Sequence, residues 1–433
     1  MRQGGIRVKD PYMRPKLHFS PQRGWINDPN GLIYAQGQYH LFAQHHPYGL
    51  AWGAMHWLHA TSPDLLHWRE EGIALYPDEH GTMFSGSAAQ LQDGRIALMY
   101  TAHGEKETQC VAFSGDGMRY EKHPGNPVID NPGYRDFRDP KIFANPVRGG
   151  YCVAVAAGDH VAFYHSMDLI SFERTGEFRP EMDEGIFECP DCFPLQTPEG
   201  EEVYVLLASM IDPRADDSCC VRYWLGSFDG DRFIPCEGCG AQRLETGYDS
   251  YAATTFFGTR DRLLMTWLPK DSHPLPLDTH CGCLSLPRAL SLVRTEGGLR
   301  LAQRCILPEG EEDAAAIESG CFVIDVSAQG DFTLALMGEE EEFSVSLCGQ
   351  EVRTSRAQNA LLPEDGAYNR LRETREKRLC GGPVQMRIVC DGYTVEIFAD
   401  GGLCAHALLL FARTPVQTIK VTGEAGFVCR MLK

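Results

Sequence analysis

Five short apolar, β-prone runs recur along the N-terminal two thirds of the chain. Each follows turn or loop residues, as expected where strands are joined by tight turns. No long helical periodicity separates the runs, and a regular interval of this length is typical of a β-propeller, whose blades surround a central axis. The runs begin at Tyr39, Ile96, Tyr151, Val203 and Arg262, at intervals of 52 to 59 residues.

A second pattern recurs in phase with the first. Four Ser-x-Asp triplets each carry an aromatic residue four positions after the Asp. Asp and Ser in such turns bond backbone groups two residues on, and the aromatic side chain returns to the core on the next strand. Single triplets of this kind are common, but four in register support a repeat, so we predict an all-β fold with a five-bladed β-propeller over residues 14–305. The triplets are Ser62/Asp64/Trp68, Ser114/Asp116/Tyr120, Ser166/Asp168/Phe172 and Ser227/Asp229/Phe233.

The repeat stops after about residue 305. An acidic stretch, PEGEEDAAA at 308–316, predicts a linker. Apolar residues then recur at every second position, which is typical of a half-buried antiparallel sheet, and we predict a C-terminal β-sandwich over residues 317–433. The alternating positions are Phe322/Ile324/Val326, Phe332/Leu334/Leu336, Phe343/Val345/Leu347, Val384/Met386/Ile388 and Val395/Ile397.

The net charge and the N-terminal residues bear on the partners and the location of the chain. The chain has 40 Lys and Arg against 59 Asp and Glu, a formal net charge of −19, and no basic run. This excess repels phosphate backbones and anionic membrane surfaces, so we expect neither nucleic acid nor a membrane as a partner. The N-terminal residues contain no apolar stretch followed by a small-residue cleavage site, which predicts a cytoplasmic location. The sequence leaves a homo-oligomer open.

Seventeen scattered cysteines are an odd number, and we expect reduced thiols rather than a disulfide framework. Two C-x-x-C pairs, Cys189/Cys192 and Cys236/Cys239, have the local spacing of zinc ligands, but the gap between the pairs is much longer than in zinc ribbons. Neither pair lies in a strand-helix-strand pattern, which a thioredoxin-like redox role requires. We therefore expect no metal and no cofactor.

Candidate chemistry lies on the innermost strand of each blade, whose end points toward the axial funnel. The segments about a dozen residues before the apolar runs are WINDPNG, MFSGSAAQL, FRDPKIF, FECPDCFPL and YDSYAATTF. Turn chemistry explains each polar residue alone. Their convergence on one axis indicates a functional site, because crowded like charges are destabilising unless a function uses them. The residues are Asp28, Ser85, Asp139, Glu188 and Asp249.

These segments resemble glycoside hydrolase family 32, the invertases, levanases, inulinases and sucrose-6-phosphate hydrolases. The resemblance covers nearly the whole chain and implies a five-bladed propeller followed by a β-sandwich. It implies that Asp28 is the nucleophile, Glu188 the general acid/base and Asp139 the transition-state stabiliser. The motifs are HFSPQRGWINDPNGLIY, WGAMHWLHATSPDLLHW, FSGSA, FRDPK, ECPD, LSLPRALSL and DGYTVEIFADGG. The implied fructose subsite comprises Asn27, Gln44, Trp52, Phe84, Ser85, Arg138 and Asp249.

The chain departs from the usual family pattern at three places. Ala43 stands where an aromatic residue is usual, Leu58 stands where glycine is usual, and SYAATTF is a loose match to the equivalent strand. These changes leave the three acids intact but affect the fit beyond the first sugar.

Cleavage of a β-fructofuranoside passes through an oxocarbenium-like state, which needs an anion on one face and a proton for the departing oxygen. Asp28 and Glu188 can supply these, so we expect a retaining hydrolase acting on a small carbohydrate: sucrose, sucrose 6-phosphate or a short fructo-oligosaccharide. A fructosyltransferase, an inverting propeller glycosidase acting on arabinosides or xylosides, and an inactive sugar-binding propeller are the alternatives. A cluster of His45, His46, Arg135 and Lys141 would favour a phosphorylated substrate.

Overall fold

The computed structural model describes residues 14–180, 185–211, 219–269, 275–312, 316–339, 342–358, 372–412 and 414–432. Regular structure in these ranges is almost entirely strand, and the helical segments there are two 3-10 turns, η2 (Ala316–Ser319) and η3 (Asp400–Gly402). Neither is long and apolar enough to cross a membrane. The all-β prediction is confirmed. The first 13 residues, on which the prediction of location depends, lie outside the described ranges.

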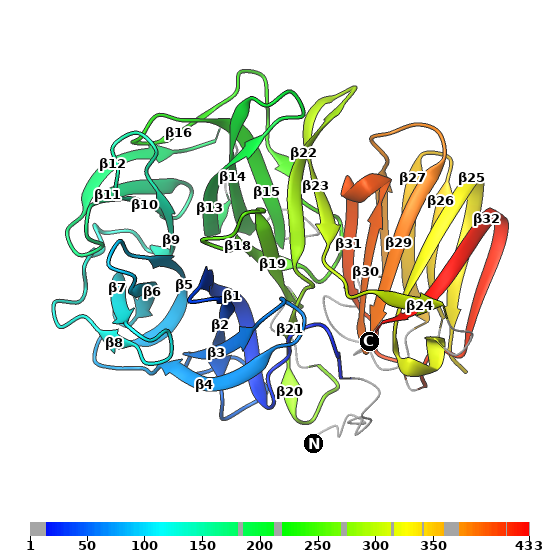
Figure 1. The fold of residues 1–433 in the computed structure, drawn as a ribbon, viewed down its shortest axis with the longest axis horizontal. Coiled ribbons are helices and arrows are strands. Elements are labelled where there is room, and N and C mark those ends of the chain that lie inside the picture. Colours follow the sequence, from blue (N-terminus) through cyan, green and yellow to red (C-terminus); the bar gives the residue numbers. More distant parts are fainter. Residues whose placement is uncertain are drawn as a thin grey trace.

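Five largely antiparallel sheets surround a common centre, and a separate sheet lies beside them (Figure 1). The five-bladed propeller is therefore confirmed. The first blade contains β1 (Gly24–Ala35), β2 (Gln38–His46), β3 (His56–Ser62) and β4 (Arg69–Leu75); the second contains β5 (Thr82–Gln90), β6 (Ile96–His103), β7 (Glu107–Ser114) and β8 (Glu121–Lys122). The third contains β9 (Arg138–Ala144), β10 (Tyr151–Ala156), β11 (Val161–Ser166) and β12 (Glu173–Phe178). The fourth contains β13 (Ile186–Gln196), β14 (Glu202–Ile211), β15 (Cys219–Phe228), β16 (Phe233–Pro235) and β17 (Gln242–Arg243); the fifth contains β18 (Tyr251–Thr255), β19 (Leu263–Leu268), β21 (Cys283–Leu284), β22 (Arg288–Thr295) and β23 (Gly298–Cys305).

The repeating apolar runs form the second strand of each blade. Every residue of β10 and of β19 is buried, because blades pack against both faces of these sheets. Burial on both faces explains why the runs are continuously apolar instead of alternating. The strands that precede them, β1, β5, β9, β13 and β18, contact one another around the centre and are the inner strands.

The Ser-x-Asp turns close hairpins in the outer half of the blades. In the first, the Asp64 carboxylate accepts backbone N–H groups of Leu66 and His67, and the Ser62 hydroxyl accepts the N–H of Leu65. Equivalent bonds form in the second and third blades. In the fourth blade, the Asp229 carboxylate accepts the backbone N–H groups of Asp231 and Arg232.

A short parallel pairing closes the ring. Strand β20 (His280–Cys281) pairs with the first residues of β1, so the last part of the propeller is fastened to the first blade. Backbone bonds between Phe257 and both Leu32 and Tyr34 add to this closure. The inner strands of the first and fifth blades are thereby held as neighbours around the axis.

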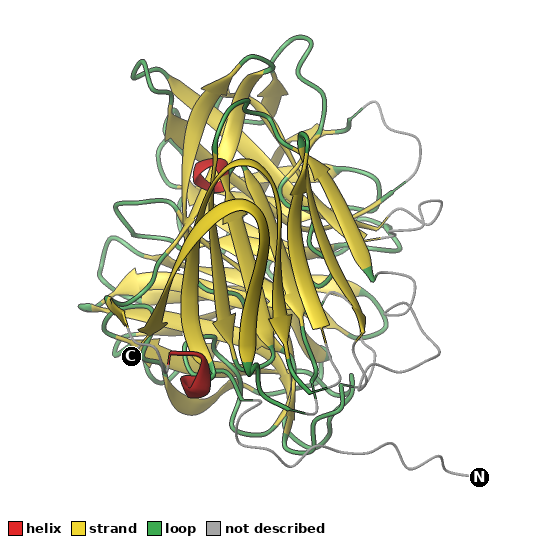
Figure 2. Cartoon of the chain, turned by 90° about the vertical axis from the view of Figure 1, so that its right-hand side faces the viewer, coloured by secondary structure: helices red, strands yellow, loops and turns green. Residues whose placement is uncertain are grey.

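The C-terminal sheet folds over into a sandwich. The long strand β25 pairs with β32 along its length, with β29 through its first half and with β26 through its second half. Figure 2 shows these strands in front of the propeller. All the predicted alternating positions lie in one buried cluster. The strands are β24 (Gly310–Glu312), β25 (Cys321–Met337), β26 (Glu342–Cys348), β27 (Glu351–Gln358), β28 (Glu373–Lys377), β29 (Val384–Asp391), β30 (Thr394–Ala399), β31 (Cys404–Leu409) and β32 (Thr418–Leu432).

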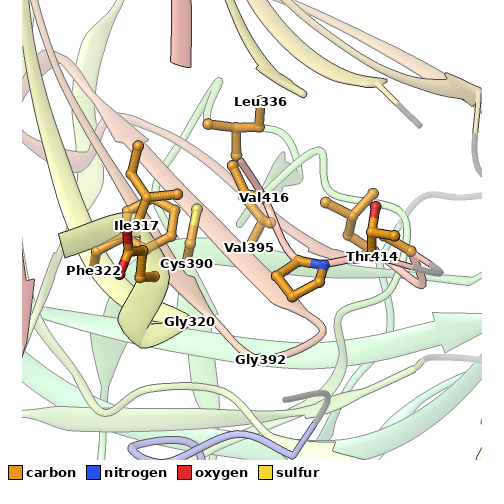
Figure 3. Close-up of a pocket in the computed structure, with 13 residues that line it drawn as sticks. Ile317, Gly320, Phe322, Leu336, Cys390, Gly392, Val395, Thr414 and Val416 are labelled. Atoms are coloured by element: carbon orange, nitrogen blue, oxygen red, sulfur yellow. The ribbon is translucent and has the colours of Figure 1, made fainter. Parts of the chain in front are cut away.

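Part of the predicted linker is ordered into the sandwich. Strand β24 lies within 308–316 and pairs with the end of β32, while residues 313–315 lie outside the described ranges. A small pocket of about 50 Å³ beside η2 is lined by Phe322, Leu336 and Val395, among others (Figure 3). Its volume is well below that of pockets that bury small-molecule ligands.

A buried ionic network joins the two parts of the chain. The Arg288 guanidinium of the propeller lies between the Glu245 and Glu396 carboxylates, the latter from the sandwich, at 3.1 and 2.9 Å. His18, in the segment before the first blade, contacts Glu396 at 2.9 Å and Asp391 at 2.8 Å. Although burial alone would lower it, these two carboxylates raise the pKa of His18 to about 9. The charges are therefore paired, as burial requires.

Candidate active site

Each inner strand has a break in register at the level where the predicted site residues lie. In β1 the break falls between Ile26 and Pro29, and in β5 between Met83 and Gly86. Corresponding breaks occur in β9, β13 and β18. A β-bulge leaves residues unpaired and re-aims their side chains. The residues released in this way include Asp28, Ser85, Asp139, Cys189 and Ala252.

Three of these released residues have left-handed backbone conformations without being glycine. The φ angles are +63° at Asp139, +45° at Cys189 and +52° at Ala252, one in each of three successive blades. Such conformations cost energy and persist where the surroundings impose them. Here the N–H of Asp139 donates to the Thr101 hydroxyl and the N–H of Cys189 donates to the Asp139 carboxylate, both at 2.9 Å.

Asp28 lies at the centre of a hydrogen-bonded group. Its Oδ2 atom accepts the Ser85 hydroxyl at 2.5 Å and the Gln44 amide at 3.1 Å. Burial, reinforced by the negative charge of Glu188, raises the pKa of Asp28 to about 6, although these hydrogen bonds oppose the shift. Asp28 is thus ionised above about pH 6, as a nucleophile must be.

Asp139 is the most deeply enclosed of the three acids. Burial, together with the negative charges of Asp28 and Glu188, raises its pKa to about 8, although the neighbouring Arg138 acts in the opposite direction. The side chain is aimed at the same centre as Asp28, because the Cys189 thiol lies 3.6 Å from one carboxylate oxygen of each.

Glu188 is held from two sides. The Arg138 guanidinium donates to Oε1 at 3.1 and 3.3 Å, and the Tyr251 hydroxyl donates to Oε2 at 2.6 Å. Burial and the charge of Glu188 raise the pKa of Tyr251 well above its usual value, so this hydroxyl stays protonated as a donor. Arg138 is itself held by Asp136 and Glu107. The Glu188 carboxyl is therefore fixed in orientation while its side chain remains partly exposed.

Comparison with known proteins identifies this arrangement. The model described as "Glycosyl hydrolases family 32 N-terminal domain" matches residues 18–304. The chain belongs to glycoside hydrolase family 32. It is 32% identical to a levanase of Bacillus subtilis (strain 168) over 91% of this chain and 65% of the levanase, and 28% identical to a sucrose-6-phosphate hydrolase of Escherichia coli over 95% and 92%. An invertase of Schizosaccharomyces pombe is 36% identical over 56% of this chain.

The chain spans 65% of the levanase and 46% of the invertase, so those relatives extend beyond it. Among solved structures, exo-inulinase from Aspergillus awamori superposes with a TM-score of 0.88 at 24% identity, covering 98% of this chain and 99% of that one. The Bombyx mori GH32 β-fructofuranosidase gives 0.80 at 25% identity, covering 98% and 95%. The propeller and sandwich of this family 32 chain thus match solved structures along nearly their whole length.

The predicted subsite of this family 32 protein also includes four residues from the first two blades, namely Asn27, Gln44, Trp52 and Phe84. Phe84 stacks on His103 with ring centroids 4.0 Å apart, and Trp52 meets the Phe84 ring edge-on at 6.3 Å. Trp52 is 54% exposed, so it offers an open aromatic face. The buried side-chain oxygens of Asn27 and Gln44 have no hydrogen-bond partner among the described residues. Unpartnered buried acceptors are costly, and sugar hydroxyls are suitable donors for them.

Asp249 does not join this group, and its predicted role in the subsite is corrected. Its carboxylate accepts the Arg356 guanidinium at 2.5 Å and the Leu409 N–H at 2.7 Å, both from the sandwich. Strand β18 begins only at Tyr251, so Asp249 precedes the inner strand and packs against the other domain. Tyr251 provides the polar contact that the fifth blade contributes to the acids, and spacing alone gave no sign of it.

The structure also places the two C-x-x-C pairs, and two residues, Lys141 and His45, of the basic cluster that would favour a phosphorylated substrate. Cys189 is in the acid site and Cys192 in a hydrophobic cluster, whereas Cys236 and Cys239 are exposed. Lys141 is buried and contacts Asp191 at 2.9 Å. The His45 ring bonds the Trp25 carbonyl, and burial lowers its pKa to about 4. Two members of the suggested phosphate cluster are therefore already engaged.

Proposed function

We propose that this chain is a β-fructofuranosidase that hydrolyses terminal β-fructofuranosides with retention of configuration. The observation that carries the proposal is the convergence of Asp28, Asp139 and Glu188 on three bulged inner strands. Cys189 links the first two acids, and Arg138 and Tyr251 orient the third. Family membership supports the same chemistry.

In the first step, Asp28 attacks the anomeric carbon and Glu188 gives its proton to the departing oxygen. The Asp28 carboxylate is poised for attack because Ser85 and Gln44 hold it in one orientation. Cys189 keeps its proton, since burial and the nearby acids raise the pKa of its thiol well above the usual range. The thiol therefore acts as a hydrogen-bond donor beside the nucleophile and not as a competing nucleophile.

In the second step, Glu188 removes a proton from water, which then displaces the fructosyl group from Asp28. Asp139 and Arg138 bind ring hydroxyls, and these bonds strengthen as positive charge develops on the sugar ring. Tyr251 steadies Glu188 while it changes from acid to base. The same steps with a sugar hydroxyl in place of water give fructosyl transfer.

We further propose that the preferred substrate is unphosphorylated. Binding a sugar phosphate requires free cationic side chains near the leaving group. Lys141 is engaged by Asp191, and His45 is neutral at physiological pH. The formal charge of −19 weighs in the same direction.

A substrate panel tests both proposals. The purified chain is incubated with sucrose, sucrose 6-phosphate, kestose, inulin and levan, and released fructose is measured, with Asp28→Ala as the control. We expect fructose from sucrose or a fructan, no more than trace release by the variant, and a lower kcat/KM on sucrose 6-phosphate. No release from any fructoside would overturn the activity, and a preference for the phosphate ester would overturn the second proposal.

Location and assembly remain predictions. We propose a cytoplasmic enzyme, whereas relatives named extracellular exo-inulinases are 31% identical over 68% of this chain. Cell fractionation followed by detection of the chain decides the location. Sedimentation of the purified protein decides whether it forms a homo-oligomer.

A further inference from the structure

A cluster of metal-ligating side chains lies in the sandwich, apart from the acids of the propeller. The Cys404 thiol is 3.1 Å from Oε2 of Glu376 and 3.4 Å from Nε2 of His406. The same Nε2 and Oε2 atoms are 3.1 Å apart. Three different ligand types therefore present one atom each to a single point.

The triangle of these atoms has nearly the size that a tetrahedral zinc site requires. Metal–sulfur and metal–nitrogen or metal–oxygen lengths of about 2.3 and 2.0–2.1 Å correspond to edges of roughly 3.3–3.6 Å at tetrahedral angles. The observed edges of 3.1, 3.1 and 3.4 Å need only a slight expansion. Thiolate, imidazole and carboxylate together suit zinc better than magnesium or calcium.

The surroundings of His406 fit a ligand as well. Its Nδ1 atom is 3.1 Å from the hydroxyl of Thr374, which in turn lies 2.6 Å from the Thr354 hydroxyl. When Nδ1–H donates to Thr374, the lone pair of Nε2 points toward Cys404 and Glu376. Hydrogen-bonded partners of this kind orient metal-bound histidines and fix their tautomer.

The cluster lies where the sandwich would otherwise be open. Glu376 belongs to β28 and the other two residues to β31, which are the two end strands of the sheet order. Strand β31 also contacts the propeller, because the N–H groups of Thr246 and Asp249 donate to carbonyls of β31. A metal ion at this point would fasten both edges of the sandwich and support the strand that rests on the catalytic domain.

We propose that Cys404, His406 and Glu376 bind a zinc ion that stabilises the sandwich, with water as the fourth ligand. The cysteine and histidine side chains are buried, and Glu376 is 21% exposed, which gives the ion a path from solvent. Only the deprotonated thiolate of Cys404 can serve as a ligand. Zinc binding therefore releases the thiol proton to solvent as the zinc–sulfur bond forms.

Cobalt substitution tests the proposal in the full chain. The protein is stripped with chelator under reducing conditions and titrated with Co²⁺, which reports thiolate ligation through a near-ultraviolet charge-transfer band and tetrahedral geometry through visible bands. We expect both to saturate at one equivalent and to disappear on addition of one equivalent of Zn²⁺. Absence of a stoichiometric thiolate band would overturn the proposal, because a purely hydrogen-bonded triad binds no metal.

Substitutions of single ligands test which side chains bind the Co²⁺ ion. Cys404→Ser should abolish the band, whereas Cys236→Ser/Cys239→Ser, which removes the exposed C-x-x-C pair, should retain it. The reverse pattern would overturn the assignment. Glu376→Gln is a milder change at a partly exposed position and should weaken Co²⁺ binding about tenfold or more; unchanged affinity would overturn the ligand set, even if Cys404→Ser fails to fold.

Measurements of thermal stability and of activity distinguish the zinc proposal from the proposed fructofuranosidase activity. Zn²⁺ should raise the Tm of the wild-type chain above its value in EDTA, since a ligand bound only by the folded state stabilises it. The initial rate of fructose release should survive chelation below the Tm of the stripped protein. A Tm that is the same with Zn²⁺ and EDTA would overturn the structural role.

Discussion

Removing the Ser85 hydroxyl should move the acid limb of the activity profile to higher pH. This hydroxyl donates to Oδ2 of Asp28 at 2.5 Å, and among the groups that hold down the pKa of Asp28 it has the largest effect. The bond stabilises the carboxylate relative to the neutral acid. Ser85→Ala removes it without changing the backbone, so a larger share of Asp28 should be protonated, and inactive as a nucleophile, at any given pH.

The size of the effect follows from the charge on the acceptor. A hydrogen bond to an ionised group contributes about 1.5–3 kcal/mol, and one pKa unit corresponds to about 1.4 kcal/mol. The pKa of Asp28, about 6 in the native chain, should therefore rise by roughly one to two units. At pH 5 the ionised fraction, and with it kcat/KM, should fall roughly 10- to 100-fold, whereas above pH 9 this loss should nearly vanish.

The assay is kcat/KM for fructose release between pH 4 and 10 by the wild-type chain and by Ser85→Ala. The matched control is Ser87→Ala on the same strand, because the Ser87 hydroxyl bonds the Pro140 carbonyl and the Ile142 N–H and no acid. The control should lose stability but keep its acid limb. A loss of the same size at every pH would mean that Ser85 only contacts substrate, and the reasoning about Asp28 would be refuted.

Three further predictions follow from the same structure. Glu188→Gln should abolish turnover of sucrose but spare much of the first step on a fructoside whose leaving group departs unprotonated, and equal losses on both would count against the acid role. Reaction in dilute methanol should give methyl β-fructofuranoside first and Asp28→Ala should give none, whereas the α-anomer would indicate inversion. Because the pKa of His18 is raised from 6.5 to about 9, its stabilising effect is full below pH 6.5 and is lost as pH rises through 9. Urea unfolding should show that loss, on the order of 3 kcal/mol, in the wild-type chain and not in His18→Gln.

The propeller could be predicted because the pattern of apolar strands and turns that repeats in each blade is visible in short stretches of sequence. The second strand of each blade is buried along most of its length, so it forms an apolar run in every blade. In the sandwich, the alternating apolar positions were predicted to face the core, and all of these residues lie in it. The course of the chain through the sandwich could not be predicted. The alternating runs at Phe322 and Phe332 form one strand, β25, which pairs with β29 in its first half and with β26 in its second half.

The acids could be predicted from their place on the inner strands, but their partners could not. Cys189 resembled a zinc ligand because of its C-x-x-C spacing, yet its thiol lies between Asp28 and Asp139. Tyr251 lies within the segment YDSYAATTF, but only Asp249 of that segment was predicted to reach the axis. Tyr251 reaches Glu188 because β13 and β18 are neighbours around the axis. Contacts between inner strands depend on ring closure and bulges, which leave no signal in local sequence.

The misplacement of Asp249 shows why equal spacing is a weaker guide at the last blade. Counting residues placed it level with Glu188, but the fifth inner strand starts two residues later, and its bulge lies at Ala252. The last blade must also meet the sandwich, so a carboxylate just before its inner strand is used to bind Arg356. A propeller closed only on itself would have no such demand. The departure from the repeat therefore lies where the domain interface replaces the axis as the partner of a buried charge.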